Sequence, residues 1–146
     1  MRLFTAAVLF SLSISALASQ CVSGLYVQGG QHCTSNRESC DDKYLFRVNC
    51  ASEVTLEMLR PSLAATKYGY RAGMVRYRGS EREGTFTQFF PSQQCGGPVT
   101  IETPAALTFK QIKLVINYQR KRYNETRCKV QSSDKRKTVQ LLKVDD

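Results

Sequence analysis

Apolar and polar residues alternate along much of this chain, and a period of two is typical of β-strands that bury one face. The alternation is clear over Tyr44–Val48 and over Val54–Met58. Over Val54–Leu63, leucines also fall at helical spacing, although Pro61 would interrupt a helix there. The pattern therefore leaves both a strand and a helix open for that segment.

An aromatic-rich segment, Lys67–Arg78, contains Gly69 and Gly73, which interrupt its pattern as bulges or close backbone contacts would. We predict a single bent strand here. The charged turn sequence Gly79–Gly84 then predicts a hairpin loop that leads into a second strand over Thr85–Phe90.

The clearest strand pattern is Leu107–Tyr118, in which the parity of the apolar residues changes at Lys110-Gln111. Such a change predicts either a bulge or the junction of two strands. A shorter alternating segment, Val99–Glu102, comes before it, and Pro104 is expected to end that strand.

After a turn at Asn124-Glu125, residues Thr126–Gln131 are predicted to return as a partner strand. The basic polar tail, residues 132–146, is expected to be solvated and dispensable for folding, although its alternating apolar residues would also suit an edge strand. We expect residues 19–131 to form a single all-β domain. The predicted architecture is a mainly antiparallel β-sandwich or β-barrel of about seven or eight strands, with at most one short helix.

The first residues follow the order of an export signal: Arg2, the apolar run Leu3–Leu17, and the small-residue stop Ala16–Ala18. The run is shorter than the roughly 20 residues that a membrane-spanning helix needs, and no second run of this kind follows. The sequence therefore predicts a signal peptide over residues 1–18, a secreted mature chain beginning near Ser19, and no transmembrane segment.

Six cysteines follow the expected cleavage point. An even number in an exported chain predicts three disulfides, which would stabilise a domain of this size. No Cys-x-x-Cys pair is present, so a metal site is not expected. The cysteines are Cys21, Cys33, Cys40, Cys50, Cys95 and Cys128.

The chain carries 21 Lys and Arg residues against 12 Asp and Glu, a net charge of +9. This charge favours anionic partners such as nucleic acid, acidic lipid headgroups or acidic polysaccharide. Basic residues beside a tyrosine at the predicted tip of the last hairpin would suit phosphate docking or base stacking, whereas a merely soluble hairpin tip is the alternative. The candidate basic binding patch comprises Arg76, Arg78, Arg120, Lys121 and Arg122.

The residues offer little for catalysis. His32 is the single histidine, which excludes nucleases that pair two histidines and zinc enzymes that need several imidazoles, and no G-x-S-x-G turn is present. We expect no catalytic residues, no metal, no cofactor and no enzymatic activity. No setting distinguishes the carboxylates considered for glycoside hydrolysis: Asp41, Asp42, Glu53, Glu57, Glu81, Glu83, Glu102 and Glu125.

Two further surface features are predicted. Asn124-Glu125-Thr126 is an N-glycosylation sequon at the expected turn, so Asn124 is a candidate glycosylation site. If the basic patch does not bind, the aromatic alternatives are Tyr68, Tyr70 and Tyr77.

A signal peptide, a small mature domain, six cysteines, a positive charge and no catalytic signature together resemble the small secreted cysteine-containing effectors of plant-associated fungi. That resemblance spans the whole chain and implies virulence through binding a host protein or masking a pathogen molecule, without enzymatic activity. An antimicrobial or killer toxin is an alternative with the same charge and disulfides.

The segment Ile112–Gln119, followed by a polar turn and Cys128, resembles the closing hairpin of the MD-2-related lipid-recognition domain. This second resemblance implies a β-sandwich that holds a lipid, with Cys21 bridged to Cys128 and Cys33 to Cys40. Loop closure favours the same pairs and leaves Cys50 with Cys95. The apolar residues available to a lipid cavity are Phe86, Phe90, Ile101, Leu107, Phe109, Leu114 and Ile116.

Overall fold

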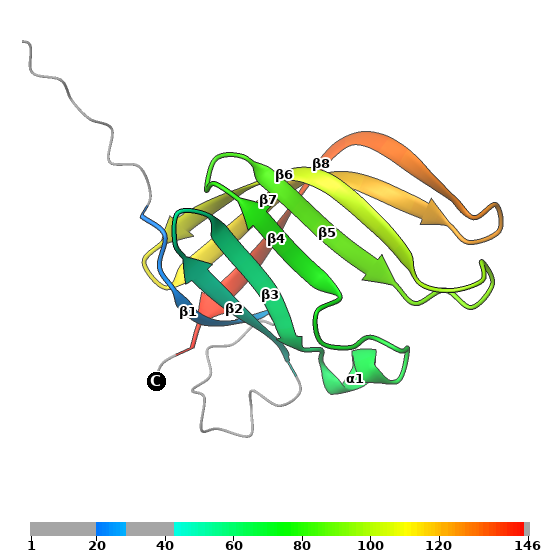
Figure 1. Cartoon of the computed structure of the whole chain (residues 1–146), viewed down its shortest axis with the longest axis horizontal. Coiled ribbons are helices and arrows are strands. Elements are labelled where there is room, and N and C mark those ends of the chain that lie inside the picture. Colours follow the sequence, from blue (N-terminus) through cyan, green and yellow to red (C-terminus); the bar gives the residue numbers. More distant parts are fainter. Residues whose placement is uncertain (1–19, 29–42, 145–146) are drawn as a thin grey trace, which may run out of the picture.

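A computed structural model describes residues 20–28 and 43–144 of the chain. Eight antiparallel strands follow one another around a closed barrel, and the last strand pairs with the first (Figure 1). The predicted all-β antiparallel fold is confirmed, in the form of a barrel. The strands of the described residues are β1 (Gly24–Gln28), β2 (Tyr44–Cys50), β3 (Val54–Arg60), β4 (Val75–Gly79), β5 (Gly84–Phe90), β6 (Val99–Lys110), β7 (Lys113–Asn124) and β8 (Lys129–Lys143). A short helix, α1, covers Leu63–Thr66.

The core lies inside the barrel because alternate residues of each strand point inward. An eight-stranded barrel has an interior just wide enough for side chains to fill. Large residues do so here, and several of them expose less than 2% of their surface. These include Tyr26, Leu56, Met58, Tyr77, Leu114, Ile116 and Leu141.

The segment that was open between helix and strand contains both in succession. Strand β3 ends at Arg60, and Pro61 separates it from α1. Ser62 caps the helix, because its side chain accepts a hydrogen bond of 3.1 Å from the Ala65 amide. The alternating interpretation of Val54–Met58 was therefore correct.

The predicted single strand over Lys67–Arg78 was wrong in its first half. Residues 67–74 form a loop, and strand β4 begins only at Val75. Gly69 and Gly73 have φ angles of 89° and 80°, which suit turns and not an extended strand. The two glycines thus lie in the loop before β4 and do not bend a strand.

The parity change at Lys110-Gln111 is a junction of two strands. Strand β6 ends at Lys110, Gln111 has a φ of 46°, and β7 begins at Lys113. Pro104 does not end the strand, contrary to expectation. Pro104 pairs with Thr85 of β5, whereas the pairing of β6 with β7 starts only at the next residue, Ala105. The edge of β6 that faces away from β5 therefore has no neighbouring strand at Pro104 among the described residues, and the missing N–H breaks no ladder there.

The tail is not a solvated extension. Strand β8 extends to Lys143, pairs with β7 along most of its length, and meets β1 at Tyr26 and Val27. Leu141 is fully buried in the core, and the Val144 amide donates a hydrogen bond of 2.8 Å to the Leu25 carbonyl. The end of the chain therefore closes the barrel.

Two of the predicted disulfide pairs, Cys21 with Cys128 and Cys50 with Cys95, were also wrong. Cys21 is bonded to Cys50, with Cα atoms 5.9 Å apart, and Cys95 is bonded to Cys128, at 5.6 Å. Strands β1 and β2 pair with Gly24 opposite Val48, so antiparallel geometry brings the residues just beyond them together. The predicted signal peptide and the predicted Cys33–Cys40 disulfide lie outside the described residues, as do His32, Asp41 and Asp42.

Candidate functional site

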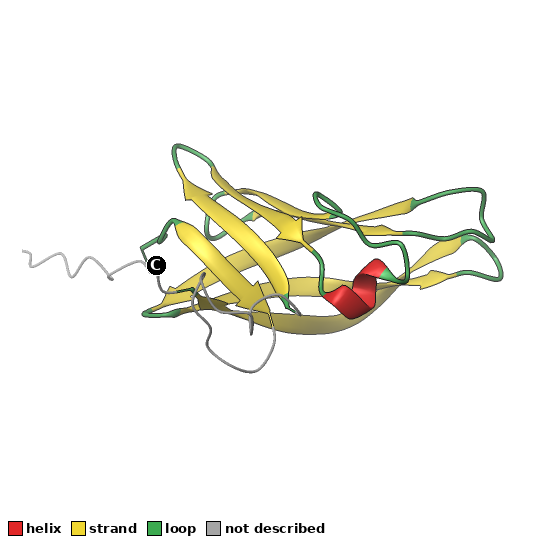
Figure 2. Ribbon diagram, turned by 90° about the horizontal axis from the view of Figure 1, so that it is seen from below, coloured by secondary structure: helices red, strands yellow, loops and turns green. Residues whose placement is uncertain are grey.

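The connections between strands differ in length at the two ends of the barrel. At one end, here called the closed end, the turns cover residues 51–53, 80–83 and 111–112. At the other, the open end, residues 61–74 and 91–98 form longer connections, and α1 lies there (Figure 2). The open end therefore offers more irregular surface on which a site can be built.

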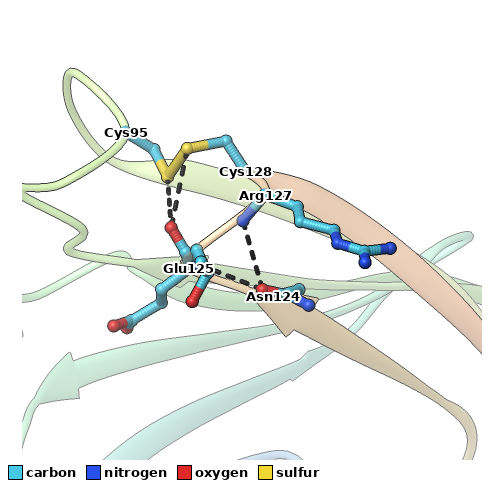
Figure 3. Close-up of a disulfide and its surroundings, with 6 residues drawn as sticks. Cys95, Asn124, Glu125, Arg127 and Cys128 are labelled. Carbon is cyan, nitrogen blue, oxygen red and sulfur yellow. Dashed lines mark hydrogen bonds between the residues drawn. A yellow bond between two sulfur atoms is a disulfide. The ribbon is translucent and has the colours of Figure 1, made fainter.

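Two ribbons project from the open end, one made of β5 and β6 and the other of β7 and β8 (Figure 1). Pairing between β6 and β7 extends only as far as Ala105 opposite Tyr118, so the ribbons separate beyond that pair. The Cys95–Cys128 disulfide joins their far ends (Figure 3). Lys121 adds a second tie, because its Nζ donates a hydrogen bond of 2.7 Å to the Glu102 carbonyl.

An aromatic pocket of about 220 Å³ opens at the mouth of the barrel. Two of its rings, Phe86 and Tyr118, pack with centroids 5.0 Å apart. Gln28 of β1 and Gln88 of β5 also line it, and Val139 of β8 and Ile116 of β7 contribute aliphatic surface. The aromatic lining residues are Tyr44, Phe46, Tyr70, Phe86, Phe89, Phe90 and Tyr118.

Two phenols of this pocket, Tyr70 and Tyr118, have a raised pKa. Burial raises the pKa of Tyr70, and the nearby Tyr44 and Glu125 raise it further. Burial also raises the pKa of Tyr118, although Arg120 and a hydrogen bond with Gln88 act in the opposite direction. At neutral pH both hydroxyls are therefore uncharged and able to donate hydrogen bonds to an acceptor.

A basic groove of about 470 Å³ continues from the pocket along the projecting ribbon. Gln88, Phe90 and Tyr118 line both hollows, so the two form one continuous surface. From residue 118 to residue 137, eight Lys and Arg residues stand against two carboxylates. The cationic residues of the groove itself are Arg120, Lys121, Arg122 and Lys137.

Strand register explains why the pocket and the groove are continuous. On β7, Leu114, Ile116 and Tyr118 face the barrel interior and are buried. Arg120 and Arg122 are the next residues of the same parity, and side chains two residues apart share a face. The inward face of the ribbon thus changes from apolar to basic where β7 leaves the barrel.

The structure divides the predicted basic patch between two places. Arg120, Lys121 and Arg122 lie together at the groove, on the body of β7 and not at the tip of the hairpin. Arg76 and Arg78 line a separate hollow with Glu53 and Glu102.

In that separate hollow, the Arg78 Nε donates to the Glu53 Oε1 at 2.8 Å, and the Arg76 guanidinium lies 5.2 Å from the centre of the Phe89 ring. Their charges are partly balanced, so this surface is a weaker anion site. The sequence interpretation missed Lys137 as a groove residue, because it placed the tail in solvent.

The three tyrosines proposed as alternatives have different positions. Tyr70 lines the aromatic pocket, whereas Tyr68 has 77% of its surface exposed and lies on the α1 connection. Tyr77 is buried in the barrel and donates a hydrogen bond to the Ser80 carbonyl. Burial raises the pKa of Tyr77 to about 12, with further contributions from Glu81 and Glu83.

The residues considered for a lipid cavity are mainly packing residues. Phe86, Phe90 and Ile116 line the aromatic pocket. The other four, Ile101, Leu107, Phe109 and Leu114, are buried in the barrel. In the described part of the chain, no helix is long and apolar enough to cross a membrane, and no group of three or more potential metal ligands is found.

Asn124 is the last residue of β7, directly before the turn over residues 125–128 that leads into β8. Its Oδ1 accepts hydrogen bonds from the amides of Thr126, at 3.0 Å, and Arg127, at 3.2 Å (Figure 3). The Glu125 carbonyl oxygen lies 3.3 Å from the Cys95 sulfur in the same turn. The turn is therefore fixed both by the asparagine side chain and by the disulfide, and glycosylation of Asn124 stays a prediction.

No protein-family model, curated protein or solved structure matches this chain.

Proposed function

We propose that this chain is an exported, non-enzymatic binding protein that acts outside the producing cell on a host protein, in the manner of a small secreted effector. Its binding surface is the open end of the barrel. One observation carries the proposal: the aromatic pocket and the basic groove share Gln88, Phe90 and Tyr118, so one partner can contact both. Aromatic and arginine side chains of this kind are enriched at protein-binding surfaces.

The size of the pocket favours a side chain of a partner over a whole lipid. Small-molecule pockets usually measure roughly 300 to 1,000 Å³, and this one measures about 220 Å³. The barrel behind it is filled by residues such as Met58 and Leu141, which are fully buried. A single aromatic or branched side chain fits that volume, and the groove beside it suits acidic groups.

The test compares two variants that lose the same charge at opposite ends of the barrel. The groove variant carries Arg120→Ser, Arg122→Ser and Lys137→Ser. The closed-end control carries Arg82→Ser, Lys110→Ser and Lys113→Ser, all exposed residues at or beside turns. Exposed charges contribute little to stability, so both variants should unfold within a few degrees of the original protein.

Binding is measured on poly-L-glutamate, on phosphatidylglycerol vesicles and on proteins retained from host extract, at several salt concentrations. The proposal expects an acidic protein ligand to be retained by the original protein and by the closed-end control but lost by the groove variant. It also expects binding to weaken with salt. Equal losses in both variants would show that only net charge matters, and a stoichiometric lipid in native mass spectra would favour the lipid-binding alternative.

A further inference from the structure

We propose that the edge of β8 that the described strands leave unpaired takes up an extended acidic segment of the partner protein as an additional β-strand. The inference rests on the proposed function and specifies how the open end would hold its partner. Strand addition of this kind supplies affinity through main-chain hydrogen bonds and specificity through pockets for alternate side chains. Both components are found along β8.

The two edges of β8 are paired to very different extents. Eleven residue pairs join β8 to β7, but only two join it to β1, namely Tyr26 with Lys143 and Val27 with Leu142. Strand β1 ends at Gln28, whereas β8 extends back to Lys129. On the β1 side of β8, from Gln140 to Lys129, no strand of the described ranges 20–28 and 43–144 is paired with it.

The part of this edge suited to pairing lies between the β1 seam and an irregularity near Ser133. The register of β8 against β7 shifts there, the Gln119 side chain donates to the Ser133 carbonyl at 3.2 Å, and the Lys135 amide donates to the Ser133 Oγ at 3.3 Å. Regular edge therefore covers residues 136–140. In such a strand every second residue directs its N–H and C=O away from the existing neighbour.

Charge identifies the occupant of the edge. Arg136 and Lys137 are exposed residues of this edge, and the exposed Lys135 directly precedes them, so an added strand with carboxylates opposite them would be stabilised. A second copy of this chain would place like charges opposite each other, which disfavours self-pairing. Nucleic acid and lipid headgroups cannot form the main-chain hydrogen bonds of a β-strand. An acidic protein segment therefore fits both the unpaired edge and its positive charge.

The aromatic pocket lies where β1 and β8 separate. Gln28, the last residue of β1, and Val139 of β8 both line it. A strand added to β8 at this point directs alternate side chains toward the barrel mouth. The proposed segment therefore combines acidic residues with one aromatic or branched residue that enters the pocket.

The experiment selects random dodecapeptides displayed on phage against the full secreted protein. The expected result is enrichment of sequences in which acidic residues alternate with apolar ones. The best sequence is then synthesised in two N-methylated forms, each blocking alternate backbone amides. If the peptide adds to β8, one form should lose affinity by at least about tenfold, because several hydrogen bonds are removed, while the other form keeps its affinity.

The outcomes separate this inference from the proposed function. Equal affinities of the two N-methylated forms, or selected peptides without acidic character, would overturn strand addition. If the groove variant still bound the peptide less well than the closed-end control, the open end would remain the binding surface with a different binding mode. If the two variants bound it equally, the proposed function itself would fail.

Discussion

At the closed end of the barrel, the turn between β4 and β5 spans residues 80–83, and the buried Tyr77 side chain reaches it to bond the Ser80 carbonyl. At the open end, the longer connection over residues 91–98 separates β5 from β6. Three tyrosines at this end, Tyr44, Tyr70 and Tyr118, line the aromatic pocket. Strands of the same alternating pattern supply both ends. Their inward residues form the core where strands surround them, and they line the pocket and the groove where the ribbons project beyond the barrel.

Each end also has a disulfide, but the two bonds constrain different things. The Cys21–Cys50 disulfide joins the segment before β1 to the end of β2. The Cys50 amide also donates a hydrogen bond of 2.8 Å to the Ser23 Oγ. Cys95–Cys128 joins two ribbons that no longer pair with each other. The first bond therefore reinforces existing pairing, whereas the second positions the walls of the groove.

The largest expected effect comes from ending the chain after Gln131. This removes most of β8, including the fully buried Leu141, and leaves both β1 and β7 without a closing neighbour. Cooperative unfolding should disappear in calorimetry. As a control, replacing the exposed Lys135 and Arg136 by Ser in the full chain should leave the melting temperature within a few degrees. A truncated chain that still melted cooperatively would contradict the role assigned to β8.

That tail shows where sequence reasoning stopped. Alternation predicted the body of the barrel, including Tyr44–Val48 and Leu107–Tyr118, because the period of two reports directly on which face is buried. In the tail, a run of charges from residue 134 to residue 137 outweighed the apolar residues that follow it. The run belongs to the projecting part of β8, and the buried part begins a few residues later.

Only part of the candidate site could be predicted from the sequence, for a related reason. Arg120 and Arg122 were recognised as charged neighbours, but their connection to the aromatic pocket depends on register and on how far β6 and β7 stay paired. The disulfide partners likewise depend on which strand ends meet. These are long-range properties, and local pattern does not encode them.

Removing each disulfide should separate its contribution to stability from its contribution to binding. The bonds span 29 and 33 residues, so loop entropy predicts nearly the same destabilisation, about 3.5 kcal/mol, for replacement of either pair by Ser. Loss of Cys95–Cys128 should additionally weaken peptide binding, whereas loss of Cys21–Cys50 should not. Urea unfolding and peptide titration below the unfolding transition measure the two effects. Equal binding losses would show that the groove needs no tie at its tip.

A smaller difference is expected between two glycines. At Gly84, an added Cβ would overlap the Tyr77 ring, whereas at Gly96 in the open end it would meet no atom within 4 Å. Gly84→Ala should therefore lower the free energy of unfolding by about 1–3 kcal/mol through overpacking. Gly96→Ala has only its φ of +81° to accommodate, at a cost of about 1 kcal/mol. If urea denaturation showed Gly96→Ala to be more destabilising than Gly84→Ala, the close packing of Gly84 against Tyr77 would not be important for stability at the closed end.

The smallest effect concerns the charge of Tyr77 at high pH. Its pKa is raised from 10.0 to about 12 in the folded protein, so the folded state keeps the phenol proton more tightly than the unfolded state does. This contribution is fully present below pH 10 and is lost as the pH rises from 10 to about 12, where it should remove about 1–2 kcal/mol. Tyr77→Phe should be less stable at neutral pH, because the hydrogen bond to Ser80 is gone, but its stability should fall less steeply over that range. Tyr70→Phe is the matched change at the open end, and urea midpoints measured between pH 8 and pH 11.5 provide the comparison. If Tyr77→Phe retained the full slope of the original protein, the alkaline loss would have to come from other groups, such as the tyrosines of the pocket.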